Sequence, residues 1–196
     1  MARPREFDTE VALKRAMAVF WAKGYAATSM DDLQTAMQIG RQSLYAAFGD
    51  KRRLYVEALH RYQLNSVAGH LARLKSGSSP MAGVTALMIG LIPTDDDERG
   101  LGCMGVGSVA EFGASDPDLV ELRARSGALL FEALSERLRD ARAAGEIDRS
   151  VDIPLAARFL QTTMQGLQLA ARGGADFVSL QDLARFAVER LKPLQA

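Results

Sequence analysis

The chain has 196 residues, 48% hydrophobic and 24% charged, close to the averages of soluble globular proteins. This composition excludes a disordered or collagen-like chain, and no stretch approaches the roughly 18 consecutive apolar residues of a membrane span. The net charge is zero, but residues 1–75 carry 12 Lys and Arg against 7 Asp and Glu, whereas residues 76–196 carry 12 against 17. The basic half either faces a polyanion or is a solvated helix surface.

The N-terminus and the cysteine count predict where the protein works. The first residues lack the apolar core of a secretion signal, and the single cysteine, Cys103, cannot form an intrachain disulfide or a multi-thiolate zinc site. His60 and His70 lie roughly 15 Å apart along a predicted helix, too far to share a metal ion. We therefore expect a cytoplasmic protein with no membrane partner, no metal and no cofactor.

Helical periodicity runs through almost the whole chain, which predicts an all-α fold. A first helix is expected between the N-cap Asp8 and the terminator Gly24. Thr28 is expected to cap a short second helix. Gly40 is expected to relieve the tight turn before a third helix that opens near Arg41.

Asp50 is expected to cap a longer fourth helix, which ends at the Gly- and Ser-rich break 76–80. An acidic loop is predicted at 94–98, and Ser179 is expected to cap the last helix. The remaining helices are predicted at about 80–92, 99–113, 118–144, 154–172 and 179–192.

Residues 28–53 have the layout of a helix-turn-helix, in which the second short helix enters the major groove of DNA. Helical spacing turns Leu44, Ala47 and Phe48 inward. The residues left facing outward are Arg41, Gln42, Ser43, Tyr45 and Ala46.

This outward set suits DNA. Arginine and glutamine can make two-pronged bonds to guanine and adenine, and serine can bond a base or a phosphate. Tyr45 and Lys51 suit phosphates, the latter because it sits at a helix N-terminus. The alternatives are that Tyr45 completes a small core and that Arg52 and Arg53 form a solvated face. Trp21 is assigned to core packing.

Two blocks, FWAKGYAATSM at 20–30 and SLYAAFGDK at 43–51, resemble the pattern of the TetR/AcrR family of repressors over about residues 7–60. The chain departs from the pattern in the turn, where the usual glycine is Gln38 and the usual serine two places later is Gly40. Carried over residue by residue, the resemblance implies DNA contacts by Thr28, Arg41, Gln42, Ser43, Tyr45 and Lys51.

The resemblance also implies a homodimer that pairs through its last two helices and reads two faces of a palindromic operator in double-stranded DNA. The broad apolar faces at 154–172 and 179–192 fit this role, although some of their residues must serve the intramolecular core. The predicted interface residues are Phe159, Met164, Leu167, Leu183, Phe186 and Leu191.

By the same resemblance, a small-molecule effector binds between the fourth helix and those that follow, and its binding releases the operator. An apolar, deformable set of side chains predicts a largely apolar effector, although core methionines have the same pattern. The effector-site candidates are Met88, Cys103, Met104, Phe112, Phe131 and Met164. As an alternative, Cys103 is a redox or electrophile sensor, or simply a small buried hydrophobe.

The prediction is an all-α protein with an N-terminal three-helix helix-turn-helix DNA-binding domain, 1–53, and a C-terminal helical ligand-binding and dimerisation domain, 54–196. Its expected function is that of a ligand-responsive transcriptional repressor. An enzyme is disfavoured because no motif for a nucleophile or a nucleotide is present. A second rival, a DNA-binding module without an effector, predicts no cavity in residues 80–150.

Overall fold

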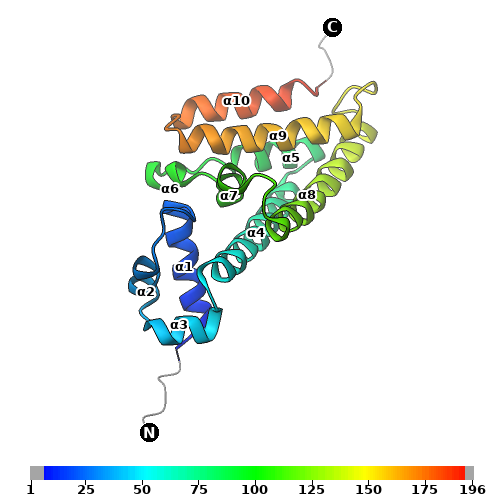
Figure 1. Cartoon of the computed structure of the whole chain (residues 1–196). Helices are drawn as coiled ribbons and strands as arrows, with labels where there is room; N and C mark the ends of the chain where they lie inside the picture. The colour runs from blue at the N-terminus through cyan, green and yellow to red at the C-terminus, as the bar shows by residue number, and fades with distance from the viewer. Residues whose placement is uncertain (1–6, 193–196) are drawn as a thin grey trace.

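The computed structural model describes residues 7–192, which form ten helices and no strand, confirming the all-α prediction. Three short helices form a head at one end, and α4 leads from this head toward the layer of helices at the other end (Figure 1). The helices are α1 (Thr9–Lys23), α2 (Met30–Met37), α3 (Arg41–Phe48), α4 (Lys51–Ser76), α5 (Pro80–Ile89), α6 (Asp96–Leu101), α7 (Met104–Phe112), α8 (Pro117–Ala143), α9 (Ile153–Arg172) and α10 (Phe177–Glu189).

Most of these helices begin at a side chain that accepts hydrogen bonds from the first turn. Asp8 and Asp50 cap α1 and α4 as predicted. The cap of α2 is Ser29 rather than Thr28, because Ser29 forms a reciprocal capping box with Asp32. Thr28 is instead buried.

Two later parts of the chain, α10 and residues 94–113, also differ from the prediction. Asp176, not Ser179, caps α10, and its carboxylate accepts the Ser179 amide in the first turn. The acidic run predicted as a loop is largely the first turn of α6, where negative charge is favoured by the helix dipole. The helix predicted at 99–113 is divided at Gly102 and Cys103 into α6 and α7.

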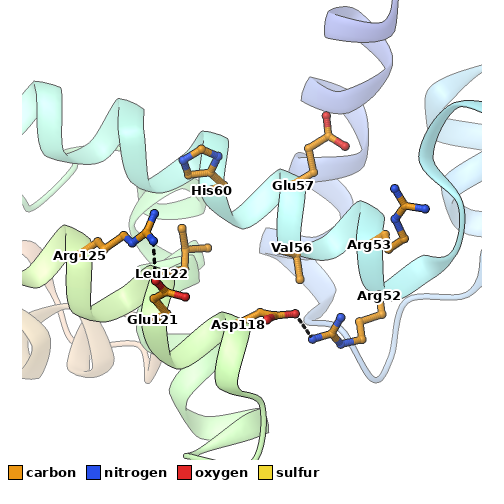
Figure 2. Close-up of a pocket in the computed structure, with 9 residues that line it drawn as sticks. All are labelled: Arg52, Arg53, Val56, Glu57, His60, Asp118, Glu121, Leu122 and Arg125. Atoms are coloured by element: carbon orange, nitrogen blue, oxygen red, sulfur yellow. Dashed lines mark hydrogen bonds and ion pairs between the residues drawn. The ribbon is translucent and has the colours of Figure 1, made fainter.

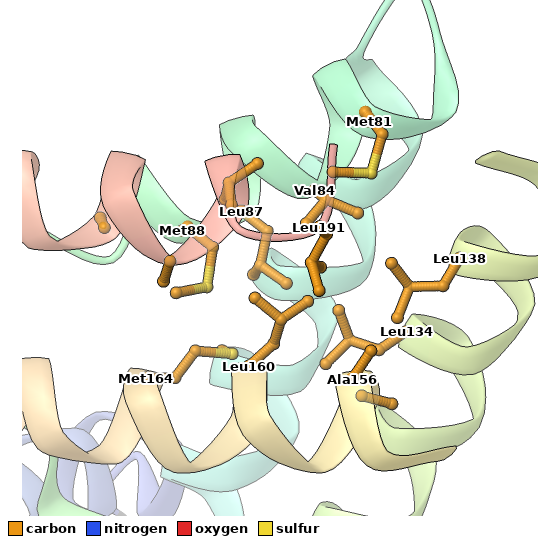
Figure 3. Close-up of a cluster of buried hydrophobic side chains, with 14 of the residues drawn as sticks. Met81, Val84, Leu87, Met88, Leu134, Leu138, Ala156, Leu160, Met164 and Leu191 are labelled. Atoms are coloured by element: carbon orange, nitrogen blue, oxygen red, sulfur yellow. The ribbon is translucent and has the colours of Figure 1, made fainter. Parts of the chain in front are cut away.

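Two separate clusters of buried side chains hold the chain together. One fills the space between α5, α8, α9 and α10 (Figure 3). The other joins α1, α2 and α3 to the first half of α4, and also includes Met104 of α7 and Leu119 of α8. Leu59 of α4 belongs to the second cluster and Leu74 to the first. The uninterrupted helix α4, of 26 residues, therefore contributes to both clusters.

Candidate DNA-binding surface and effector cavity

Helix α3 presents a polar face to solvent. Leu44 and Phe48 are buried against α1 and α4, whereas Arg41, Gln42 and Tyr45 are exposed. The Arg41 guanidinium lies 5.7 Å from the centre of the Tyr45 ring, so these two side chains share one patch. Ser43 is half-buried. Ala47, which was expected to pack inward, is exposed because two inward residues already fill the space beneath this short helix.

The turn before α3 is built differently from the prediction. The left-handed residue is Gln38, with φ 58° and ψ 39°, whereas Gly40 has an ordinary φ of −71° and is the N-cap of α3. Arg15 of α1 holds this turn by donating to the Gln38 side-chain oxygen, at 2.8 Å, and to the Met37 carbonyl. The glycine is therefore not required at the position where it stands.

The remaining predicted DNA contacts have different surroundings. Lys51 is the first residue of α4, and its Nζ lies 4.3 Å from the centre of the Tyr25 ring. Thr28 is only 1% exposed, and its hydroxyl donates to the Gly24 carbonyl at 2.6 Å. The predicted DNA contact by Thr28 is therefore wrong for this conformation, because the side chain is used inside the head.

Arg52, in the first turn of α4, is bonded to the start of α8 and does not form a free solvated face. Its guanidinium makes two parallel bonds of 2.9 Å to Asp116, the N-cap of α8. A third bond, of 2.6 Å, joins it to Asp118 (Figure 2). The bonds from Arg52 hold the pKa of Asp116 below its ordinary value. A groove of about 390 Å³ lies beside this cluster between α4 and α8, and its charged side chains carry both signs.

A larger cavity of about 760 Å³ lies among α1, α4, α7, α8 and α9. This volume is within the range of small-molecule sites. Of the six predicted effector residues, Cys103 and Met164 line it. Its apolar wall also includes Trp21, Val106 and Leu130.

The other four effector predictions are wrong, because each side chain packs into a core. Met88 is fully buried between α5 and its neighbours, and Phe131 packs against the same cluster. Met104 and Phe112 belong to the cluster of the head.

The polar part of the cavity wall was missed by the sequence pattern. Gln161, Gln165 and Gln168 recur on one face of α9, and the amide nitrogens of Gln161 and Gln168 donate to the Gly127 and Leu91 carbonyls. An amide row on an otherwise broadly apolar helix is the signal that could have revealed this wall.

Two aromatic side chains of the cavity also carry information. His70 of α4 contacts the Ser66 hydroxyl through Nε2 at 3.1 Å, and burial, followed by the nearby Arg73, lowers the pKa of His70 to about 4. The ring is therefore neutral at pH 7. Trp21, assigned to core packing, is half-buried in the cavity wall and donates its Nε1 proton to the Gly102 carbonyl at 3.1 Å.

Helices α9 and α10 lie side by side (Figure 1). Their outer faces expose several large apolar side chains. Phe159 is 42% exposed, and Leu183 and Phe186 are each 55% exposed. The interface prediction is wrong for its other three residues, because they face α5 and α8 inside the chain's own core. Met164, Leu167 and Leu191 are each exposed by 7% or less.

Comparisons with known proteins identify this arrangement. Residues 12–58 match the model of bacterial regulatory proteins of the tetR family. The chain is 34% identical to the uncharacterized HTH-type transcriptional regulator YezE of Bacillus subtilis (strain 168), over 93% of this chain and 95% of the relative. It is 32% identical to the HTH-type transcriptional repressor ComR of Escherichia coli (strain K12), over 93% and 88% of the two chains.

The chain belongs to the TetR family. Solved structures agree: a cysteine mutant of the TetR family regulator CifR, complexed with 26-bp double-strand operator DNA, superposes with a TM-score of 0.80 at 29% identity, covering 97% of this chain and all of that one. This TetR-family chain is thus a helix-turn-helix transcriptional regulator, and its relatives are regulators rather than enzymes.

Between residues 7 and 192, no helix has both the length and the apolar character needed to cross a bilayer. In the same range, no three His, Cys, Asp or Glu side chains are grouped so as to hold a metal ion.

Proposed function

We propose that this regulator is a repressor, which binds a palindromic operator as a homodimer and leaves it when a small, largely apolar effector occupies the cavity. The observation that carries the proposal is the exposed patch of Arg41, Gln42 and Tyr45 on α3, which is followed in the chain by Lys51 at the start of α4. Paired heads would set two such helices about 34–36 Å apart, one turn of DNA.

Each residue of the proposed DNA-binding surface has its own role. Arg41 and Gln42 read base edges, Tyr45 and Lys51 bind phosphates, and the half-buried Ser43 contacts a base or a phosphate. In this proposal residues 1–53 bind DNA, and residues 54–196 bind the effector and the second copy. A regulator of this kind works in the cytoplasm, where the chromosome is.

The DNA-binding part is tested by operator titrations at several salt concentrations, with duplexes taken from upstream of the neighbouring gene. Lys51→Ala removes one phosphate contact from each subunit of the homodimer, so binding should weaken for all sequences and the salt slope should fall by about 2. Arg41→Ala should weaken binding by about 1–3 kcal/mol per half-site and relax the preference at one base pair of each half-site. Fluorescence anisotropy measures both quantities.

Lys75→Ala is the matched control, because this exposed lysine lies at the far end of the same helix. It should leave affinity and salt slope unchanged. Wild-type-like binding by both Arg41→Ala and Lys51→Ala would refute the proposed reading surface.

The effector is proposed to be largely apolar. Apolar side chains, glutamine amides and a neutral imidazole make up most of the cavity wall, and its charged members are Arg73, Glu98 and Arg123. A molecule with more polar groups than this wall can pair would lose hydration on entering the cavity. An effector that prefers one of two head positions by about 1–3 kcal/mol is sufficient for release.

Sensing through Cys103 is a second candidate function, because its half-buried thiol lines the cavity. Structures of the similar regulator CifR were obtained with cysteine mutants. Oxidants or electrophiles should then release wild-type protein from its operator but not Cys103→Ser. Equal release of both proteins would assign the thiol to packing.

A further inference from the structure

Glu111, in the last turn of α7, reaches across to the loop that follows α1. Its two carboxylate oxygens accept the backbone amides of Tyr25 and Ala26, at 2.8 and 2.7 Å. Successive amides that converge on one carboxylate form an anion-binding nest. The contact joins residues 85 and 86 positions apart in the chain.

Two local features favour this contact. A carboxylate in the last turn of a helix opposes the helix dipole, so Glu111 is unfavourable for α7 alone and is compensated by the two amides. Gly24, with φ 80°, turns the loop toward α7, and a Cβ atom there would lie 2.6 Å from the Glu111 Oε1 atom. The loop therefore approaches the carboxylate as closely as a side-chain-free residue allows.

The same short helix forms part of the cavity wall. Val106, Val109 and Ala110 of α7 line the cavity, and Cys103 precedes the helix as its N-cap. Because α7 has only nine residues, a shift at its cavity face moves Glu111 as well.

On the head side, the loop leads directly to a proposed DNA contact. The Tyr25 ring packs on Phe112 of α7 and on Tyr55 of α4, with ring centres 5.1 Å apart in each pair, and the Lys51 ammonium lies over the same ring. Glu111 and Phe112 thus hold the backbone and the ring of the residue on which Lys51 rests.

We propose that Glu111 is a positioning residue that transmits the state of the cavity to the DNA-binding head, through the loop 24–26 and Lys51. This inference rests on the proposed function, because it assumes that the head binds an operator. Glu111 itself does not contact DNA or the effector.

The test uses the single cysteine to fill the cavity without knowledge of the effector. The full-length protein is modified at Cys103 with N-ethylmaleimide, and its affinity is measured for the duplex selected by wild-type protein. Modification of wild type should weaken operator binding about fivefold or more, within the usual range of allosteric coupling. In Glu111→Gln, which replaces one accepting oxygen with a donor, modification should change the affinity less than twofold.

Two controls isolate the contact. Glu132→Gln removes an exposed carboxylate of α8 and should retain the wild-type response. Cys103→Ser treated with the reagent should bind as it does untreated, which shows that the adduct acts through the thiol. An undiminished response in Glu111→Gln, or no response in wild type that binds the duplex, overturns the inference. Failure of wild type to bind any duplex instead overturns the proposed function.

A second measurement applies if Glu111→Gln loses operator binding altogether. Hydrogen exchange of the Tyr25 and Ala26 amides is followed in wild-type protein with and without the maleimide adduct, in the absence of DNA. The adduct should accelerate exchange at these two amides at least about threefold, because they lose their acceptor. Identical exchange in both samples shows that the cavity and the loop are not linked.

Discussion

Gln38 occupies the left-handed position of the turn before α3, and within residues 7–192 every other residue with a positive φ is glycine. For a residue with a Cβ atom, this conformation costs about 1–2 kcal/mol. The Arg15 bond to the Gln38 oxygen offsets part of that cost and fixes the turn to α1. The tight turn was predictable, but its strained position was not, because the chain has a glycine two residues later.

Replacing Gln38 should therefore separate strain from contact. Gln38→Gly relieves the left-handed strain, but it also loses the Arg15 bond and adds freedom to the unfolded chain, so its free energy of unfolding should stay within about 0.5 kcal/mol of wild type. Gln38→Ala keeps the strain and loses the Arg15 contact, so it should be less stable than wild type. Urea denaturation measures both, and equal stability of the two variants would contradict this account.

His70 gives the protein a second property at the scale of a single side chain. Its folded pKa is about 4, below the ordinary value of 6.5. Between these two pH values the His70 ring binds a proton in the unfolded chain but stays neutral in the folded chain. The resulting stability is complete above about pH 6.5 and is lost as the pH falls toward 4.

Between pH 7 and pH 5, this difference should lower the free energy of unfolding by about 2 kcal/mol. His70→Gln removes the titrating ring and should flatten the stability profile in this range. His60→Gln, at the exposed second histidine of α4, is the control and should follow wild type. Thermal unfolding at a series of pH values distinguishes the three proteins.

At the scale of the elements, periodicity located the helices, whereas the choice between adjacent caps required tertiary structure. Thr28 and Ser29 are both good caps, and Asp176 and Ser179 are another such pair. Thr28 does not cap α2, because the fold buries its side chain and its hydroxyl donates to the Gly24 carbonyl. No pattern along one helix contains that information.

The assignment of each face of a helix also required tertiary structure. The apolar pattern of α9 was read correctly as broad, but it consists of an inner face that contains Met164 and Leu167 and an outer face that contains Phe159. A sequence cannot assign the faces to a core or a partner without knowing the neighbouring helices. The cavity was harder to predict, because its wall is assembled from several helices and combines apolar residues with glutamines.

For the whole molecule, the uncovered faces of α9 and α10 determine the expected assembly. Contiguous exposed apolar side chains of this size mark interaction surfaces in soluble proteins. In the described chain Leu155, Phe159, Leu183 and Phe186 lie on these two helices. A second copy of the same faces would bury them in a four-helix arrangement.

Phe186→Glu should weaken this pairing, because it places a charge where an aromatic ring would be buried. The dimer dissociation constant should rise at least about tenfold, equivalent to about 1.4 kcal/mol. Leu64→Glu, at an exposed leucine of α4, should leave the assembly unchanged. Analytical ultracentrifugation decides, and a Phe186→Glu protein that still pairs at wild-type concentrations would place the interface elsewhere.

The position of Trp21 has a practical consequence for testing the effector proposed for this regulator. It is the sole tryptophan of the chain, and its indole both lines the cavity and donates to the junction between α6 and α7. Indole emission depends on the polarity of its surroundings, so the unlabelled protein carries its own optical reporter. Candidate compounds can be ranked by fluorescence titration before any promoter or target gene has been identified.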